Sequence, residues 1–97
     1  SMARTLVQSV NRVVRSDFPA SCSSHVWGCT VRIGYRSWIY IVDGLPAEFD
    51  ACVEIHERKH ADGWRHSDKL TKWVDCGDGS FRYPNGNEVV LSKEVIL

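Results

Sequence analysis

Apolar residues recur along the N-terminal segment, Ala3–Arg15, at a spacing that predicts an amphipathic helix. The apolar side of this predicted helix carries Leu6, Val7, Val10, Val13 and Val14. The other side carries Arg4, Gln8, Asn11, Arg12 and Arg15. We expect the helix to end at Asp17-Phe18-Pro19, since the residue before a proline avoids the helical region.

Two runs rich in β-branched and aromatic residues follow, and they predict an antiparallel hairpin. The first strand runs from Val26 to Ile33 and the second from Trp38 to Val42, with Gly34 at the turn between them.

A longer helix is predicted from about Pro46 to Ala61. Proline suits the first position of a helix, and a glycine such as Gly63 commonly follows the last turn. One face of this helix is an apolar stripe made of Phe49, Cys52 and Val53. His56 and His60 continue that stripe, so we expect both imidazoles to point inward.

The remaining residues predict a short helix and a second hairpin. The helix follows Ser67 and carries Leu70, Trp73 and Val74. The hairpin strands, Ser80–Tyr83 and Glu88–Leu91, flank the turn signal Pro84-Asn85-Gly86-Asn87. The whole pattern predicts an α+β fold in which an antiparallel sheet packs on the helix of residues 46–61.

Length and charge narrow the functional classes. The 97 residues make one domain, in which Ser1-Met2 resembles a cloning remnant. The net charge of +0 gives no basic excess, which argues against a nucleic-acid partner or a membrane anchor. The longest apolar run, Trp38–Val42, is too short to cross a bilayer, and no secretory signal is visible. A cytoplasmic location is therefore expected.

The four cysteines, at positions 22, 29, 52 and 76, contain no C-x-x-C pair and therefore no zinc-ribbon pattern. For a cytoplasmic chain we expect reduced thiols, with Cys52 packed in the core. A Cys22–Cys29 bridge stays open as the alternative if the protein is exported.

The chemically informative segment is His56-Glu57-Arg58-Lys59-His60, which has the pattern H-E-x-x-H. Residues four apart on a helix are neighbours, so the two imidazoles can bind one metal ion from successive turns. Catalytic zinc typically takes three protein ligands and keeps a fourth position for water. Glu57, next to the first ligand, is the candidate general base for that water.

His66 supplies the third ligand in this prediction. Gly63 lies midway between His60 and His66, and glycine adopts positive φ readily, so the chain can turn there and bring His66 back to the metal. The full pattern H-E-x-x-H-x-x-G-x-x-H resembles the zinc motif of the metzincin metallopeptidases. The resemblance implies that His56, His60 and His66 bind one zinc ion and that Glu57 is the catalytic base.

The resemblance also implies a small zincin-like fold. No methionine follows His66, so the chain lacks the methionine turn of metzincins and is similar to a minimal zincin domain. Trp38–Val42 is similar to the strand that pairs with extended peptide substrates in zincins. In the related gluzincins the third ligand is a later glutamate, and Glu88 and Glu94 are the downstream candidates. Tyr40, Arg82 and Tyr83 are candidates to stabilise the oxyanion.

Two functions from different classes follow. The first is zinc-dependent hydrolysis of peptide bonds in a protein substrate. The second is a non-catalytic protein-binding or inhibitory module in which zinc is a structural staple. A structural site normally has a fourth protein ligand, for which Cys52, Asp68 and Cys76 are the candidates, whereas an open position favours the enzyme.

Overall fold

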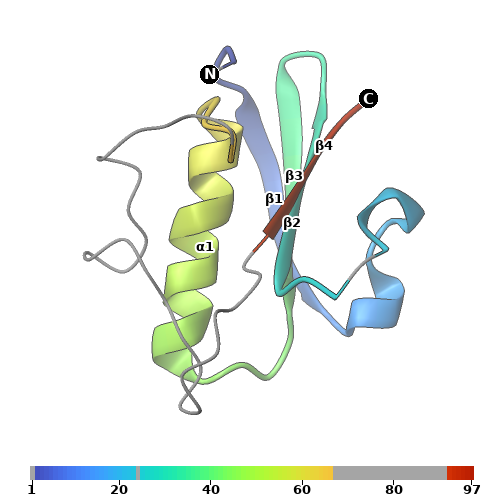
Figure 1. Ribbon diagram of the computed structural model, residues 1–97, viewed down its shortest axis with the longest axis vertical. Helices are drawn as coiled ribbons and strands as arrows, with labels where there is room; N and C mark the ends of the chain where they lie inside the picture. The colour runs from blue at the N-terminus through green and yellow to red at the C-terminus, as the bar shows by residue number, and fades with distance from the viewer. Residues whose placement is uncertain (1, 24, 67–91) are drawn as a thin grey trace.

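A computed structural model describes residues 2–23, 25–66 and 92–97. It has the element order β1 (Leu6–Val13), η1 (Arg15–Asp17), η2 (Ala20–Cys22), β2 (Gly28–Ile33), β3 (Arg36–Val42), α1 (Ala47–Ala61) and β4 (Ser92–Ile96). The α+β class is confirmed: one side of the sheet is covered by α1 and the other by the segment that contains η1 and η2 (Figure 1). The short helix and second hairpin predicted within residues 67–91 lie outside the described residues.

The four described strands form a mixed sheet in the order β1-β3-β2-β4. The predicted hairpin is confirmed: β2 and β3 pair antiparallel from Gly28↔Ile41 to Ile33↔Arg36. Gly34 at its turn has φ of +59°. The expectation of an antiparallel sheet is wrong, because β1 pairs parallel with β3, and β4 pairs parallel with β2.

The predicted N-terminal helix is also wrong, since residues 6–13 form strand β1. The pairing of β1 with β3 has an irregularity between Val7 and Ser9, which inserts one extra residue. In a regular strand, residues three apart point to opposite faces. Because of the bulge, Val7 and Val10 point to the same face of the sheet, where both pack against the cluster beneath α1. The bulge explains the helix-like spacing of Val7 and Val10, whereas Val13 packs on the opposite face of the sheet. Apolar residues on both faces of a bulged strand together imitated the spacing of a helix.

The two faces of the sheet bury different clusters. Ile39, Ile41, Phe49 and Val53 pack between the sheet and α1, and the last two come from the helix. Phe18, Cys22, Val26, Cys29 and Val31 form the cluster on the opposite face. The alternation of side chains along β2 therefore turns Thr30 and Arg32 toward α1 and turns Cys29 and Val31 away from it.

Among the described residues, no helix is long and apolar enough to span a membrane.

The expectation of reduced thiols is wrong. Cys22 and Cys29 form a disulfide that fixes η2 to the middle of β2, with Cα atoms 6.1 Å apart. Cys52, which was expected to pack as a thiol, is disulfide-bonded as well. The alternative that the sequence left open, a Cys22–Cys29 bridge, is the arrangement in the structure.

We expect the paired substitution Cys22→Ala and Cys29→Ala to lower the free energy of unfolding by roughly 2–3 kcal/mol, because the bridge removes loop-closure entropy from the unfolded chain. Urea unfolding in the absence of reductant, monitored by tryptophan fluorescence, measures this difference in the free energy of unfolding. An unfolding free energy equal to that of the wild type would contradict a structural role for the bridge.

Candidate metal centre

The sheet-facing side of α1 carries both histidines of the H-E-x-x-H segment. His56 is 6% exposed and His60 is fully buried, and they continue the buried stripe of Phe49, Cys52 and Val53. The expectation that both imidazoles point inward is confirmed. Because the helix spacing places them one turn apart, their ring centroids lie 5.0 Å from each other.

His66 completes a cluster of three imidazoles. Its Nε2 lies 3.0 Å from Nε2 of His56 and 3.1 Å from Nε2 of His60. These three residues are the group with metal-ligating geometry in the described part of the chain, and their ligand atoms lie within 4.8 Å of one another. His66 is exposed, so the cluster opens to solvent on the side of that ring.

The spacing of these nitrogens suits one small cation. Zinc binds imidazole nitrogen at about 2.0–2.1 Å, which places two nitrogens of a tetrahedral site about 3.3 Å apart. The two distances from His66 Nε2 are within a few tenths of an ångström of this value, and all three ligand atoms lie within 4.8 Å of one another. One proton on His66 Nε2 can form a hydrogen bond to only one of the other two Nε2 atoms at a time. One cation can be bound by both of those atoms and by His66 Nε2 together.

The chain reaches this geometry through the C-terminal cap of α1. Gly63 has φ of +105°, and its N–H donates to the carbonyl of His60 while that of Trp64 donates to the carbonyl of Lys59. These two bonds define a Schellman motif, in which a glycine with positive φ reverses the chain after the last helical turn. The prediction that the chain turns at Gly63 and brings His66 back to the histidine pair is confirmed.

Several carbonyl groups at the C-terminal end of α1 and its cap accept hydrogen bonds from residues that are distant in sequence. Thr5 donates from both its backbone N–H and its hydroxyl to the carbonyl of Ala61, at 2.7 Å and 2.8 Å. Met2 N–H donates to the carbonyl of Gly63. Arg32, which is 4% exposed, donates to the carbonyl of His60. The N-terminal segment and β2 together hold the cap from which His66 projects.

Hydrogen bonding also sets the tautomer of His60. Its Nδ1 lies 2.8 Å from the carbonyl oxygen of Trp64. Because a carbonyl only accepts, Nδ1 carries the proton and Nε2 presents its lone pair to the cluster. Burial, together with repulsion from His56, lowers the pKa of His60 to about 3. The ring is therefore neutral near physiological pH, as metal binding requires.

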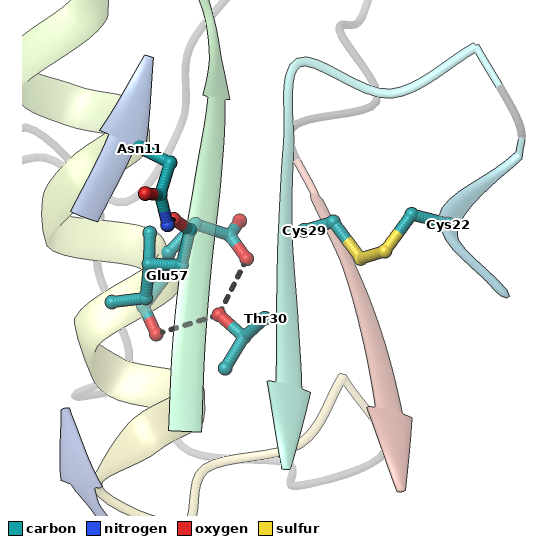
Figure 2. Close-up of a disulfide and its surroundings, with 6 residues drawn as sticks. Asn11, Cys22, Cys29, Thr30 and Glu57 are labelled. Carbon is teal, nitrogen blue, oxygen red and sulfur yellow. Dashed lines mark hydrogen bonds between the residues drawn. A yellow bond between two sulfur atoms is a disulfide. The ribbon is translucent and has the colours of Figure 1, made fainter. Parts of the chain in front are cut away.

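Glu57 lies in the layer between α1 and β2. It is fully buried, and its Oε1 accepts a hydrogen bond of 2.8 Å from the hydroxyl of Thr30 (Figure 2). Gly28 allows this close approach, since a Cβ there would lie 2.7 Å from Val53 Cγ1 and 2.9 Å from Glu57 Oε2. The contact with Thr30 places the carboxylate of Glu57 against the sheet.

Other candidates from the sequence fall elsewhere. Tyr40 packs near Phe18 on the face of the sheet opposite α1, so its hydroxyl is not beside the histidines. The expected substrate strand, residues 38–42, lies in the sheet interior and pairs with β1 on one side and β2 on the other. It therefore has no open edge for a peptide. Arg82, Tyr83 and Glu88 lie outside the described residues.

Two contributions to the site were missed in the sequence. One is the carbonyl of Trp64, because backbone groups give no residue-type signal. The other is Arg32, for which the available signal was a charged residue within the run of β-branched and aromatic residues from Val26 to Ile33.

Comparisons of the chain with protein-family models, with curated proteins and with solved structures found no match.

We expect Gly63→Ala to destabilise the fold and to abolish tight zinc binding. Positive φ alone costs a non-glycine residue about 1–3 kcal/mol. In addition, the new Cβ would lie 1.8 Å from the carbonyl oxygen of Met2. Gly34→Ala is the matched control, since Gly34 also has positive φ but a Cβ added there would meet nothing within 4 Å. Calorimetric zinc titration and urea unfolding compare the two variants, and equal effects of both on zinc binding would contradict the role given to Gly63.

Proposed function

We propose that this domain binds one zinc ion through His56, His60 and His66 and uses it to hydrolyse peptide bonds in a protein substrate. The observation that carries the proposal is the cluster of three imidazoles, in which Nε2 of His66 lies 3.0 Å from Nε2 of His56 and 3.1 Å from Nε2 of His60. This set of nitrogen donors fits zinc, because imidazole nitrogens are good ligands for this ion.

The number of ligands within the described residues favours catalysis. Three protein ligands plus an open position are typical of catalytic zinc, whereas structural zinc has four protein ligands. In the described part of the chain the ligand group contains the three histidines alone. Cys52, one candidate for a fourth ligand, is disulfide-bonded and has no thiolate to offer. Asp68 and Cys76 lie outside the described residues.

The zincin resemblance of the motif suggests the reaction. Bound zinc would supply Lewis acidity and lower the pKa of a coordinated water to about 7. His60 would present a fixed lone pair, because its Nδ1–H is held by the carbonyl of Trp64. The exposed ring of His66 marks the side from which substrate would approach. Glu57, the residue after His56, would accept the proton of the attacking water and pass it to the leaving amine.

A second function is favoured by the position of Glu57. Its carboxylate accepts a hydrogen bond from Thr30 in the layer between helix and sheet, which is a structural contact. In this alternative the zinc ion is a staple that holds the helix cap, and the domain is a non-catalytic binding or inhibitory module. The two functions differ in what Glu57 does when the metal is bound.

The disulfides bear on the compartment. Structural disulfides persist in oxidising environments and are rare in the cytosol. Because Cys22–Cys29 and Cys52 are disulfide-bonded, we place the proposed activity in an oxidising compartment in preference to the cytoplasm expected from the sequence.

We expect Glu57→Gln to retain one zinc per chain and to hydrolyse peptides about 10²–10⁴-fold more slowly than the wild type, because it removes the general base. The assay is the release of new amino termini from a mixture of unstructured peptides, with zinc content measured on the same samples. Glu54→Gln is the matched control, since Glu54 lies on the same helix but forms exposed ion pairs with Arg12 of β1 and with Arg58, and it is not part of the histidine cluster.

Zinc-loaded wild type that releases no amino termini, or Glu57→Gln with the rate of the wild type, would contradict the peptidase. In the first case the structural staple would be the function that remains.

A further inference from the structure

Glu94 lies on β4, opposite Thr30 in the register of the sheet, and its side chain is 8% exposed. Its register places it on the α1 side of the sheet, like Thr30. There its carboxylate lies close to three nitrogen groups. Its Oε2 is 3.8 Å from Nδ1 of His60 and 3.8 Å from Nη1 of Arg32, and its Oε1 is 3.4 Å from Nε of Arg65.

Arg32 compensates the buried charge of Glu94. Its guanidinium donates to the carbonyls of His60 and Ala3. Arg32 therefore holds the backbone of His60, while Glu94 faces the ring of the same residue. A buried carboxylate without a nearby cation would be costly, and this arrangement offsets that cost.

The contact with Arg65 extends this restraint to the third histidine. Arg65 directly precedes His66, so a carboxylate that attracts Arg65 also restrains the segment that carries the His66 ring. One side chain on the C-terminal strand thus acts on two of the three histidines.

We infer that Glu94 is a positioning residue of the metal centre, which orients His60 and His66 and strengthens His60 as a ligand. The inference rests on the proposed metal site. A carboxylate near the N–H of a metal-bound imidazole makes the ring a better donor, and removal of such a partner typically weakens metal binding 10–100-fold. The carbonyl of Trp64 accepts the hydrogen bond from Nδ1, and Glu94 adds negative charge beside the same N–H.

This role differs from the one that the gluzincin comparison suggested for Glu94. As a third ligand, its carboxylate would lie on the Nε2 side of the rings. It lies instead beside Nδ1 of His60, and His66 occupies the third position of the cluster.

The test compares zinc affinity in the full chain, measured by competition with a chromophoric chelator, for wild type, Glu94→Gln and Glu94→Asp. We expect Glu94→Gln to bind zinc about 10–100-fold more weakly than the wild type. Glu94→Asp keeps the charge opposite Arg32, and therefore the fold, but withdraws the carboxylate by one methylene, so we expect an intermediate affinity. Glu54→Gln removes a carboxylate that also pairs with arginine, outside the cluster, and we expect about the affinity of the wild type.

The visible spectrum of the Co²⁺-loaded protein distinguishes a change in the position of the ligands from a loss of protein stability. With Co²⁺ in place of zinc, we expect the visible d–d bands of the folded Glu94 variants to shift to longer wavelength, since a weaker donor gives a smaller ligand field. Affinity and spectrum equal to those of the wild type in both Glu94 variants would overturn the inference while leaving the metal site intact. Absence of zinc binding by the wild type would overturn the metal site itself, and with it the inference.

Discussion

The reversal of the chain at Gly63 is the constraint on which the three-histidine cluster depends. A helix alone can place His56 and His60 side by side, but it carries later residues away from them. The positive φ of Gly63 and the two capping bonds turn the chain within three residues, so that His66 returns to the histidine pair. The same turn places the carbonyl of Trp64 against the far nitrogen of His60. One backbone motif therefore supplies the third imidazole and fixes the tautomer of the second.

The sheet provides the rigid support for this turn. Hydrophobic packing of Phe49 and Val53 against Ile39 and Ile41 fixes α1 over β2 and β3. The cap itself is held by polar contacts, from Thr5, Met2 and Arg32. Most of these groups come from segments far from the histidines in sequence. The geometry of the three-histidine cluster is thus coupled to the N-terminal segment and to two strands, and a change in any of them is expected to reach the cluster.

The sequence predicted the parts of this arrangement that local chemistry determines. The helix of residues 47–61, the hairpin of β2 and β3, the inward histidines and the turn at Gly63 all follow from periodicity and from residue conformational preference. The strand β1 was missed because its apolar residues lie on both faces of the sheet and are interrupted by a bulge, which together imitate helical spacing. The parallel pairings and the positions of Arg32 and Glu94 could not be predicted, since they depend on contacts between residues distant in sequence. The disulfides depend in addition on the redox state of the compartment, which local sequence does not encode.

We propose that three imidazoles and no cysteine hold one zinc ion at the cap of α1. X-ray absorption at the zinc edge, on protein loaded with one equivalent of zinc, identifies the ligands. We expect three imidazole nitrogens and one further light atom at about 2.0–2.1 Å. A sulfur atom at about 2.3 Å, or fewer than three imidazoles, would contradict it.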